Sequence, residues 1–245
     1  MIPPLSPRPP SKPGAGSGGS SRNISRKYPG CQVEVATLSP YQSDRRDTLT
    51  SEGGISDSCN FHVANALNMP FDGSSFDLLW SLESGEHMPN KTSFVDELFR
   101  VTNLGGRIIL VTWCHRNIDS DGEGGVGVLP LIRGEESLLA KINWSYYLPR
   151  WCSIDNYVSL MEERGAENVK RDDWSYTITP FWRSVIQYIL NLKRLTGLAR
   201  SGFLMIRGAY AMLLILKGLD TGLINFGCIT CTNPMDVGEE EKGER

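Results

Sequence analysis

Two apolar runs that flank a helical pattern constrain the fold of this chain more than any other feature. Residues 76–81 (FDLLWS) and 107–113 (RIILVTW) are almost continuously apolar, as is typical of strands buried on both faces of a parallel sheet. Between them, residues 91–102 repeat apolar side chains at the spacing of an amphipathic helix. A strand, a helix and a second strand in this order form a crossover unit. The sequence therefore predicts an α/β fold with a mostly parallel sheet.

Weaker patterns extend this sheet on both sides and add helices to it. The predicted architecture is a three-layer α/β sandwich with a helical cap, whose closing strand at 223–232 runs antiparallel. Further strands are expected at 31–38, 60–64 and 167–174. Helices are expected at 20–28, 40–51, 135–147, 153–165, 180–196 and 203–218.

The N-terminal segment is set apart by its prolines. Residues 1–13 hold six of the fourteen prolines, and proline removes the backbone donors that a central strand needs. We therefore expect a disordered Pro-rich tail over 1–13, followed by one folded domain over 14–234. Cap segments are expected near 117–150 and 178–220, and residues 235–245 form a charged tail.

Composition argues against several classes of function. The formal net charge is -3, and no basic patch or basic helix suggests nucleic-acid binding. Cys228 and Cys231 form a lone C-x-x-C without the further ligands of a zinc site, so no metal is expected. The most apolar stretch, Gly202–Leu216, is interrupted by Arg207 and too short to span a bilayer. A peripheral association with a membrane surface stays open.

A glycine-rich loop precedes the first predicted helix. Gly14, Gly16 and Gly18 would let backbone amides approach a charged ligand closely, and the helix that follows would favour a carboxylate at its N-terminus. A flexible Gly/Ser linker beside the Pro-rich tail is the alternative interpretation. The loop alone therefore does not define a site.

Polar side chains follow both of the strong predicted strands. Leu82–Met88 (LESGEHM) comes after the first strand, and Thr112–Arg116 (TWCHR) ends the second. Because the carboxyl ends of parallel strands meet at one edge, where open α/β sheets bind ligands, these segments predict a functional site. The candidate residues are Glu83, His87 and His115. The alternatives are a solvated loop for the first segment and a hydrogen-bonded structural histidine at His115.

Taken together, these segments resemble the gamma-tocopherol methyltransferase family. The resemblance covers about residues 14–234, and its most specific parts are SGEHMP and VTWCHR. It also rests on GAGSGGSSR, ATLSPYQ, FHVANALNMPFDGSSFDLLWSLESGEHMPNK and the closing LINFGCITCTNP. Plant N-methyltransferases of indole alkaloids share this pattern, so that alternative stays open. A truncated, non-catalytic relative that only binds a partner or a lipid surface is the other alternative.

The resemblance implies a Rossmann-like fold and S-adenosylmethionine as cofactor. The glycine loop would face the methionine part, Thr37 and Gln42 the ribose, and the turn from Asn65 the adenine. The family usually has Asp where this chain has Asn65, which implies weaker binding rather than none. The implied cofactor-binding residues are Gly14, Gly16, Gly18, Thr37, Gln42, Asn65, Ala66, Leu67 and Ser81.

The implied reaction is methyl transfer to an aromatic ring carbon of a prenylated phenol such as gamma-tocopherol. A base near the phenol would raise its nucleophilicity, and the candidates in order are His87, Glu83 and His115. The helices at 180–196 and 203–218 would line a prenyl-tail pocket or simply pack as a cap. The family implies a plastid location, with the cytoplasm as the alternative. The oligomeric state stays open.

The chain departs from the family at its first strand. Lys12 and Pro13 stand where the family has an acidic residue next to an apolar one at the end of a central strand. We therefore expect the first central strand to be missing or degenerate, as in an N-terminally truncated member of low stability. Its place in the sheet would be vacant, or filled by the 1–13 tail in extended form.

Overall fold

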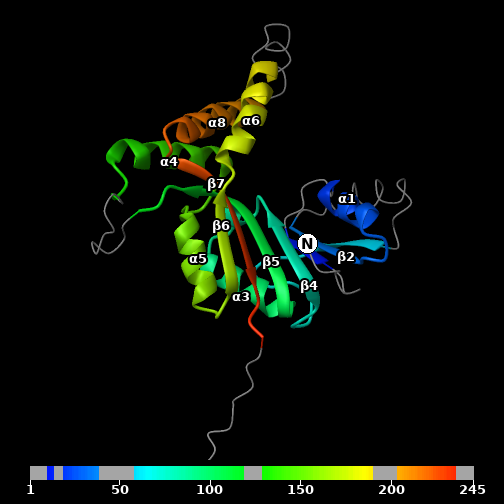
Figure 1. The fold of residues 1–245 in the computed structure, drawn as a ribbon. Helices are drawn as coiled ribbons and strands as arrows, with labels where there is room; N and C mark the ends of the chain where they lie inside the picture. Colours follow the sequence, from blue (N-terminus) through cyan, green and yellow to red (C-terminus); the bar gives the residue numbers. More distant parts are fainter. Residues whose placement is uncertain (1–9, 14–18, 39–57, 119–128, 190–202, 236–245) are drawn as a thin grey trace, which may run out of the picture.

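The computed structural model describes residues 10–13, 19–38, 58–118, 129–189 and 203–235. Its centre is a seven-stranded sheet in the order β3-β2-β1-β4-β5-β7-β6 (Figure 1). The strands are β1 Pro10–Pro13, β2 Val33–Thr37, β3 Cys59–Val63, β4 Phe76–Leu82, β5 Thr102–His115, β6 Glu167–Asp173 and β7 Ile224–Thr232. The pairs from β3 to β5 are parallel, and β7 runs antiparallel to both of its neighbours. The predicted mostly parallel sheet with an antiparallel closing strand is confirmed.

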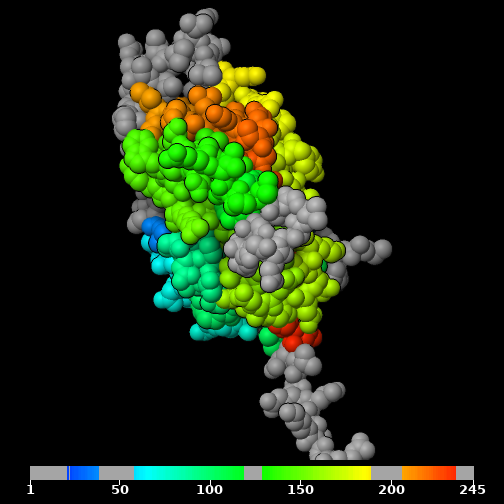
Figure 2. All heavy atoms as spheres, turned by 90° about the vertical axis from the view of Figure 1, so that its left-hand side faces the viewer, coloured from blue at the N-terminus to red at the C-terminus, as the bar shows by residue number. Residues whose placement is uncertain are grey.

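Helices cover both faces of this sheet. On one face lie α3 (Lys91–Val101) and α5 (Ile154–Glu162), whose apolar sides pack against β4, β5 and β7. The other face packs against α1 (Gly19–Lys27) beside β2, and against the cap beside β5 and β7. The helices of the cap are α4 Arg133–Tyr146, α6 Ser175–Ile189 and α8 Phe203–Asp220. Figures 1 and 2 show α4 and α8 packed side by side at one end of the molecule.

The side chains of β5 point alternately to the two faces of the sheet, and this explains why the strand joins two cores. Leu110 faces α3 and α5, where it packs among fully buried side chains such as Phe94 and Tyr157. Trp113 faces the opposite side and stacks against Phe226 of β7, with 4.7 Å between the ring centroids. Side chains of successive residues in a strand point to opposite faces, so a run that is apolar throughout requires cover on both.

The helix expected at 180–196 begins earlier than the sequence suggested. The expected range begins at Pro180, but α6 already begins at Ser175. The reason is a side-chain cap: Asp173 Oδ1 accepts hydrogen bonds from the backbone N–H of Ser175 at 2.9 Å and from its hydroxyl at 2.5 Å. A carboxylate in this position satisfies an otherwise free donor of the first turn. Residues beyond 189 lie outside the described part of the chain.

The expectation that residues 1–13 form no central strand is wrong for residues 10–13. Pro10–Pro13 is the strand β1, and Ser11 pairs with Glu34 of β2 on one side and with Leu79 of β4 on the other. An extended segment between β2 and β4 can form backbone hydrogen bonds with both strands. These bonds contribute more stability than the two missing proline donors remove. The place of the first central strand is therefore filled by part of the N-terminal segment in extended form, which was one of the two expected outcomes. Residues 1–9 lie outside the described residues.

Replacing the two prolines of β1 should stabilise the protein. We expect Pro10→Val with Pro13→Val to raise the free energy of unfolding by about 1 kcal/mol, because restored N–H donors outweigh the proline's restriction of the unfolded chain. Urea denaturation followed by circular dichroism would measure it. Pro130→Val, at an exposed position outside the sheet, is the matched control and should give no gain. A loss of stability in the double variant would contradict a strand at this position.

Candidate active site

The carboxyl ends of the parallel strands meet at one edge of the sheet, and several of the predicted site residues lie there. Thr37 ends β2 and is buried, and its carbonyl accepts a hydrogen bond from the N–H of Ala64 at 2.8 Å. This contact ties the end of β2 to the segment that follows β3. It thus places Thr37 beside the turn that begins at Asn65.

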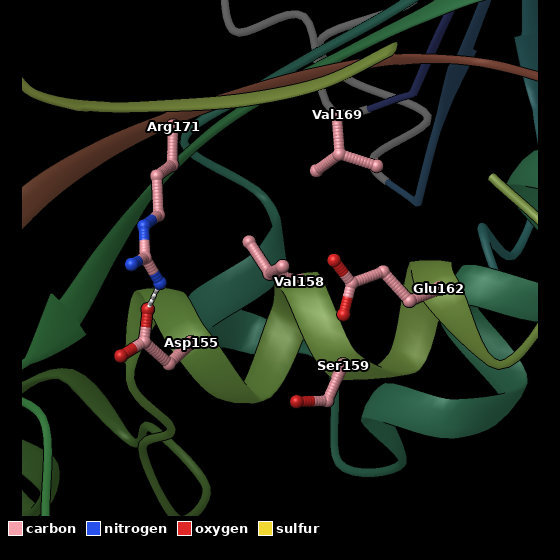
Figure 3. Close-up of a pocket in the computed structure, with 6 residues that line it drawn as sticks. All are labelled: Asp155, Val158, Ser159, Glu162, Val169 and Arg171. Atoms are coloured by element: carbon pink, nitrogen blue, oxygen red, sulfur yellow. Dashed lines mark hydrogen bonds and ion pairs between the residues drawn. The ribbon is translucent and has the colours of Figure 1, made fainter. Parts of the chain in front are cut away.

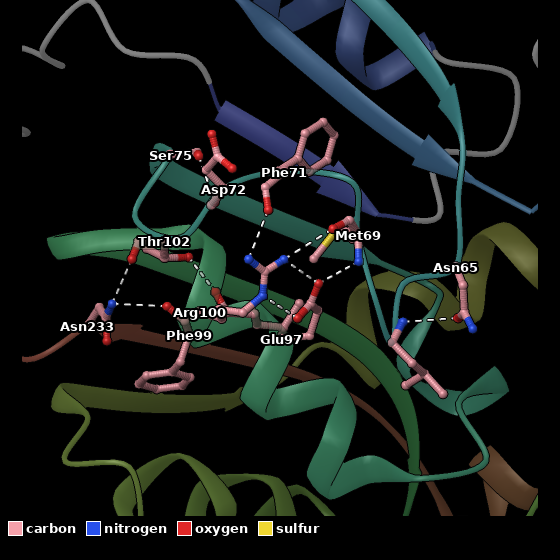
Figure 4. A network of polar contacts seen from close by, with 12 residues as sticks. Asn65, Met69, Phe71, Asp72, Ser75, Glu97, Phe99, Arg100, Thr102 and Asn233 are labelled. Atoms are coloured by element: carbon pink, nitrogen blue, oxygen red, sulfur yellow. Dashed lines mark hydrogen bonds and ion pairs between the residues drawn. The ribbon is translucent and has the colours of Figure 1, made fainter.

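The segment after β3 closes into a tight turn. The side-chain oxygen of Asn65 accepts from the N–H of Leu67 at 3.0 Å, and its carbonyl accepts from the N–H of Asn68 at 3.0 Å (Figure 4). Ala66 is buried and Leu67 half-buried, while the Asn65 amide is exposed. A short polar side chain that bonds to the backbone two residues ahead is a common way to hold such a turn.

An ion pair between the buried Glu97 and the exposed Arg100 supports this turn. Glu97 of α3 accepts from the N–H of Met69 at 2.5 Å and from Arg100 Nε at 2.7 Å. Arg100 in turn donates to the carbonyls of Phe71 and Met69 at 2.9 Å and 3.1 Å (Figure 4). The pair therefore clamps residues 69–71, which connect the turn to β4. Sequence reasoning missed it, since a Glu and an Arg three residues apart look like an exposed helix pair.

The segment after β4 carries the most specific sequence motif. Ser81 and Ser84 are both buried, with 2.5 Å between their hydroxyl oxygens. Glu83 between them is exposed and has a left-handed backbone with φ of 51°. The chain then forms the one-turn 3₁₀ helix η2 (Gly85–His87). A left-handed residue other than glycine is uncommon and reverses the chain sharply, which sends η2 back across the edge of the sheet.

His87 is the residue of η2 that faces solvent. Its side chain is 55% exposed, whereas Gly85 and Glu86 are buried. Partial burial and the positive charge of Lys91 lower the pKa of His87, while the charge of Glu83 raises it. An imidazole with a lowered pKa is neutral near pH 7, which is the form that accepts a proton.

Beneath His87 lies a polar cluster that sequence reasoning missed. Glu86 is 5% exposed, and its carboxylate accepts a hydrogen bond from the Thr112 hydroxyl of β5 at 2.6 Å. Burial raises the pKa of Glu86, which the Thr112 hydroxyl and the charge of Lys91 partly offset. Gly85 is packed so closely that a Cβ there would lie 2.8 Å from the Thr112 hydroxyl and 2.9 Å from that of Tyr157. The sequence could not predict the burial of Glu86, because the residue lies in a polar segment that is typical of an exposed loop.

The structure separates His115 from the exposed part of this edge. His115 is 5% exposed, and its Nδ1 lies 2.6 Å from the carbonyl oxygen of Arg116. Its backbone pairs with Ser153 at the start of α5. Burial lowers the pKa of His115. This geometry matches the alternative of a hydrogen-bonded structural histidine better than that of a base at the surface.

Four predicted cofactor residues, Gly14, Gly16, Gly18 and Gln42, lie outside the described residues. A depression of about 370 Å³ lies between α5 and β6, lined by Asp155, Val158, Ser159, Glu162, Val169 and Arg171 (Figure 3). Asp155 and Arg171 form an ion pair across it. None of the predicted site residues lines it.

Comparisons with known proteins place these features in context. A family profile described as "Methyltransferase domain" matches residues 12–110. The chain is 48% identical over 221 residues to a probable chloroplastic tocopherol O-methyltransferase of Oryza sativa subsp. japonica. It is 45% identical over 222 residues to the chloroplastic tocopherol O-methyltransferase of Arabidopsis thaliana. These alignments cover 90% and 91% of this chain but only 59% and 62% of the relatives, so the chain spans about three fifths of their length.

More distant similarities include a sequence relative and solved structures with the same fold. The norajmaline N-methyltransferase of Rauvolfia serpentina is 30% identical, over 89% of this chain and 73% of that protein. A solved structure of a putative sarcosine dimethylglycine methyltransferase from Galdieria sulphuraria superposes with a TM-score of 0.77 at 20% identity, covering 94% of this chain and 80% of its own. A geranyl diphosphate methyltransferase in complex with SAM gives a TM-score of 0.74 at 20% identity, over 95% and 81% of the two chains.

Proposed function

Because the chain belongs to the S-adenosylmethionine-dependent methyltransferase family, we propose that it methylates a prenylated phenol such as gamma-tocopherol, as in tocopherol biosynthesis. The observation that carries this proposal is the intact SGEHMP turn, which presents His87 at the same sheet edge as the Asn65 turn. The acceptor we favour is a ring carbon ortho to the phenol. The names of the two tocopherol relatives make the phenolic oxygen the competing acceptor. Those names also support a plastid location.

The described residues fit the nucleoside end of S-adenosylmethionine. Ala66 and Leu67 offer apolar surface to a flat ring, and the exposed amide of Asn65 can both donate to and accept from a base edge. Thr37 lies beside them at the end of β2. When bound, this cofactor supplies an electrophilic methyl group on a sulfonium. The task left to the chain is to hold the acceptor in line with that methyl group, exclude water and take up a proton.

His87 is the best-placed base among the three candidates. Its imidazole is solvent-accessible, and its lowered pKa keeps it neutral near pH 7. Transfer to a ring carbon forms a carbon–carbon bond, breaks the methyl–sulfur bond and releases one proton overall. The phenol first gives up its proton, which raises electron density at the ortho carbon. That carbon then loses its hydrogen as a proton while the ring regains aromaticity, and the phenolate oxygen takes up a proton to restore the hydroxyl. We assign uptake of the phenol proton to His87.

Product analysis tests this function and separates its alternatives. The purified chain would be incubated with S-adenosylmethionine and either gamma-tocopherol or an indole alkaloid such as norajmaline. We expect a singly methylated tocopherol whose new methyl resonance in NMR is that of an aryl methyl. A methoxy resonance would move the acceptor to oxygen, and turnover of the alkaloid alone would favour the N-methyltransferase alternative. A folded chain that methylates neither would favour a non-catalytic relative.

Restoring a carboxylate at the adenine turn should tighten cofactor binding. Asn65→Asp keeps the oxygen that accepts from the Leu67 N–H, and it adds a charge-assisted acceptor for the adenine amino group. We expect the Kd for S-adenosylhomocysteine to fall about 3- to 10-fold, since a hydrogen bond to a charged group contributes roughly 1 kcal/mol more than a neutral one. Calorimetric titration would measure it. Asn168→Asp, at an exposed position of β6 at the other end of the sheet, is the control, and equal affinities for wild type and Asn65→Asp would contradict this adenine position.

We propose that the cap contacts the prenyl tail and a membrane surface. Trp144, Tyr147, Phe181 and Tyr210 on the three cap helices are exposed, and amphipathic aromatic rings of this kind suit a lipid interface. The described part of the chain has no helix that is both long and apolar enough to cross a membrane. Because the cap would contact the prenyl tail, turnover should fall when the chromanol lacks that tail. Equal kcat/KM for tailed and tail-less acceptors would contradict the contact.

A further inference from the structure

The first residue of α3 is one that helix electrostatics disfavour. α3 begins at Lys91, after the N-cap residue Asn90, whose side-chain oxygen accepts from the N–H of Ser93 at 3.0 Å. The N-terminus of a helix carries a partial positive charge that favours Asp or Glu. Here the first turn contains no acidic residue. A lysine at this position therefore needs a compensating contact.

The ammonium of Lys91 finds that contact in η2. Its Nζ donates to the carbonyl oxygens of Gly85 at 2.8 Å, Glu86 at 3.2 Å and Met88 at 2.8 Å. A lysine ammonium has three N–H donors, so these three carbonyls use all of them. The three acceptors flank His87 on both sides in the chain. The half-buried lysine thus ties together the backbone of the turn that presents the imidazole.

A second contact fixes the same turn from the sheet side. Glu86 is held by the Thr112 hydroxyl of β5, and Gly85 lies against Thr112 and Tyr157 without room for a side chain. With Lys91 on one side and β5 on the other, η2 has its backbone restrained from two directions. His87 alone within it extends toward solvent.

We propose that Lys91 is a positioning residue, which fixes the backbone of η2 through three carbonyls and so sets the place and charge of the His87 imidazole. The inference rests on the proposed function, in which His87 takes up the phenol proton. Three charged side chains face this imidazole. Glu83 precedes η2, Glu86 lies within it with Oε1 3.8 Å from His87 Nε2, and Lys91 begins α3. The positive charge of Lys91 lowers the pKa of the imidazole and so supports its neutral form, whereas the charge of Glu83 raises that pKa.

The test replaces the lysine and follows both catalysis and the imidazole. In Lys91→Met we expect kcat to fall about 10- to 10²-fold, because a small displacement of a catalytic group is enough for such a loss. KM for S-adenosylmethionine should stay within about threefold. The titration midpoint of His87, followed by NMR in ¹³C-histidine-labelled protein, should move to higher pH. The ring resonances of His62 on β3, which is paired with Glu34, serve as the internal control for an intact fold.

Two further variants keep the test decisive. Lys91→Arg retains a charged donor and should restore the His87 midpoint and most of kcat. Lys91→Gln keeps amide donors without the charge, so it serves if Lys91→Met does not fold, and its His87 midpoint should also rise. An unchanged His87 midpoint in both neutral variants would overturn the proposal. A wild-type chain that methylates no phenol, yet shows the His87 shift, would instead overturn the proposed function.

Discussion

His87→Ala should lower kcat for methylation of a prenylated phenol by about 10²-fold or more, while S-adenosylhomocysteine still binds. A positioned base contributes roughly 10²- to 10⁴-fold to a reaction of this kind. The side chain is 55% exposed, so its removal should leave the core and the stability of the fold nearly intact. A loss of turnover without a loss of cofactor affinity is therefore the expected signature.

The matched control for this variant is His62→Ala. His62 lies on β3, is partly exposed, and pairs with Glu34 at 2.6 Å away from the SGEHMP turn. Its turnover should stay within about twofold of wild type. The pH profile adds a second criterion: kcat of the wild type should rise with pH through the pKa of His87, and that rise should vanish in His87→Ala. An unchanged rate in folded His87→Ala would remove His87 from the mechanism.

Arg100→Met should destabilise the protein by about 2 kcal/mol at neutral pH. The substitution leaves the Glu97 carboxylate, 6% exposed, without its charged partner, and it frees residues 69–71 from their clamp. Removing one member of a buried ion pair costs roughly 3–5 kcal/mol, and access of solvent to Arg100 reduces that figure. Denaturant unfolding measures the loss. We also expect weaker binding of S-adenosylhomocysteine, because the clamped segment leads from the adenine turn.

The pH dependence of this loss follows from Glu97. Burial by itself raises the pKa of Glu97, but hydrogen bonds from Arg100 and the Met69 N–H outweigh it and lower the pKa overall. A lowered carboxyl pKa stabilises the fold above the unfolded-state pKa, and this stability is lost as the pH falls through the folded pKa. Without Arg100 the pKa rises, so the difference between variant and wild type should shrink near pH 4. Arg107→Met, at an exposed position of β5, is the control, and equal stability of Arg100→Met and wild type would contradict the clamp.

Two central strands of the sheet could be predicted because their residues are apolar on both faces. Residues 76–81 form most of β4, and residues 107–113 lie within the longer β5, since only a central position buries such runs. β5 begins at Thr102, directly after α3, because Phe76 pairs with Thr102 before a register shift. The spacing of apolar residues alone could not place that boundary.

Strand β1 could not be predicted from its own residues. Two of the four residues in Pro10–Pro13 lack an N–H, which argues against a central strand wherever local sequence decides. The deciding contribution is the backbone hydrogen bonding of β2 and β4, whose facing edges would otherwise lack a strand to pair with. Tertiary context here outweighs local propensity, as it does for Lys91 at the start of α3.

The common location of several candidate residues could be predicted from the sequence, whereas their roles stay predictions. The carboxyl edge of the sheet holds four of them: Thr37, Asn65, Ser81 and His87. Each ends or follows a parallel strand, and the carboxyl ends of parallel strands share one edge. Their supporting residues, Lys91, Glu86, Thr112, Glu97 and Arg100, could not be identified, since each acts through a contact between segments far apart in the sequence or through backbone carbonyls. The roles of the glycine loop and Gln42 stay predictions outside the described residues.

The sheet edge should bind the cofactor with the short strand β1, Pro10–Pro13, at its centre. Calorimetric titration of the folded chain with S-adenosylhomocysteine tests it most directly. We expect one site per chain with a micromolar Kd, or about −8 kcal/mol of binding free energy. A chain that shows a cooperative unfolding transition but no binding at millimolar ligand would contradict the claim.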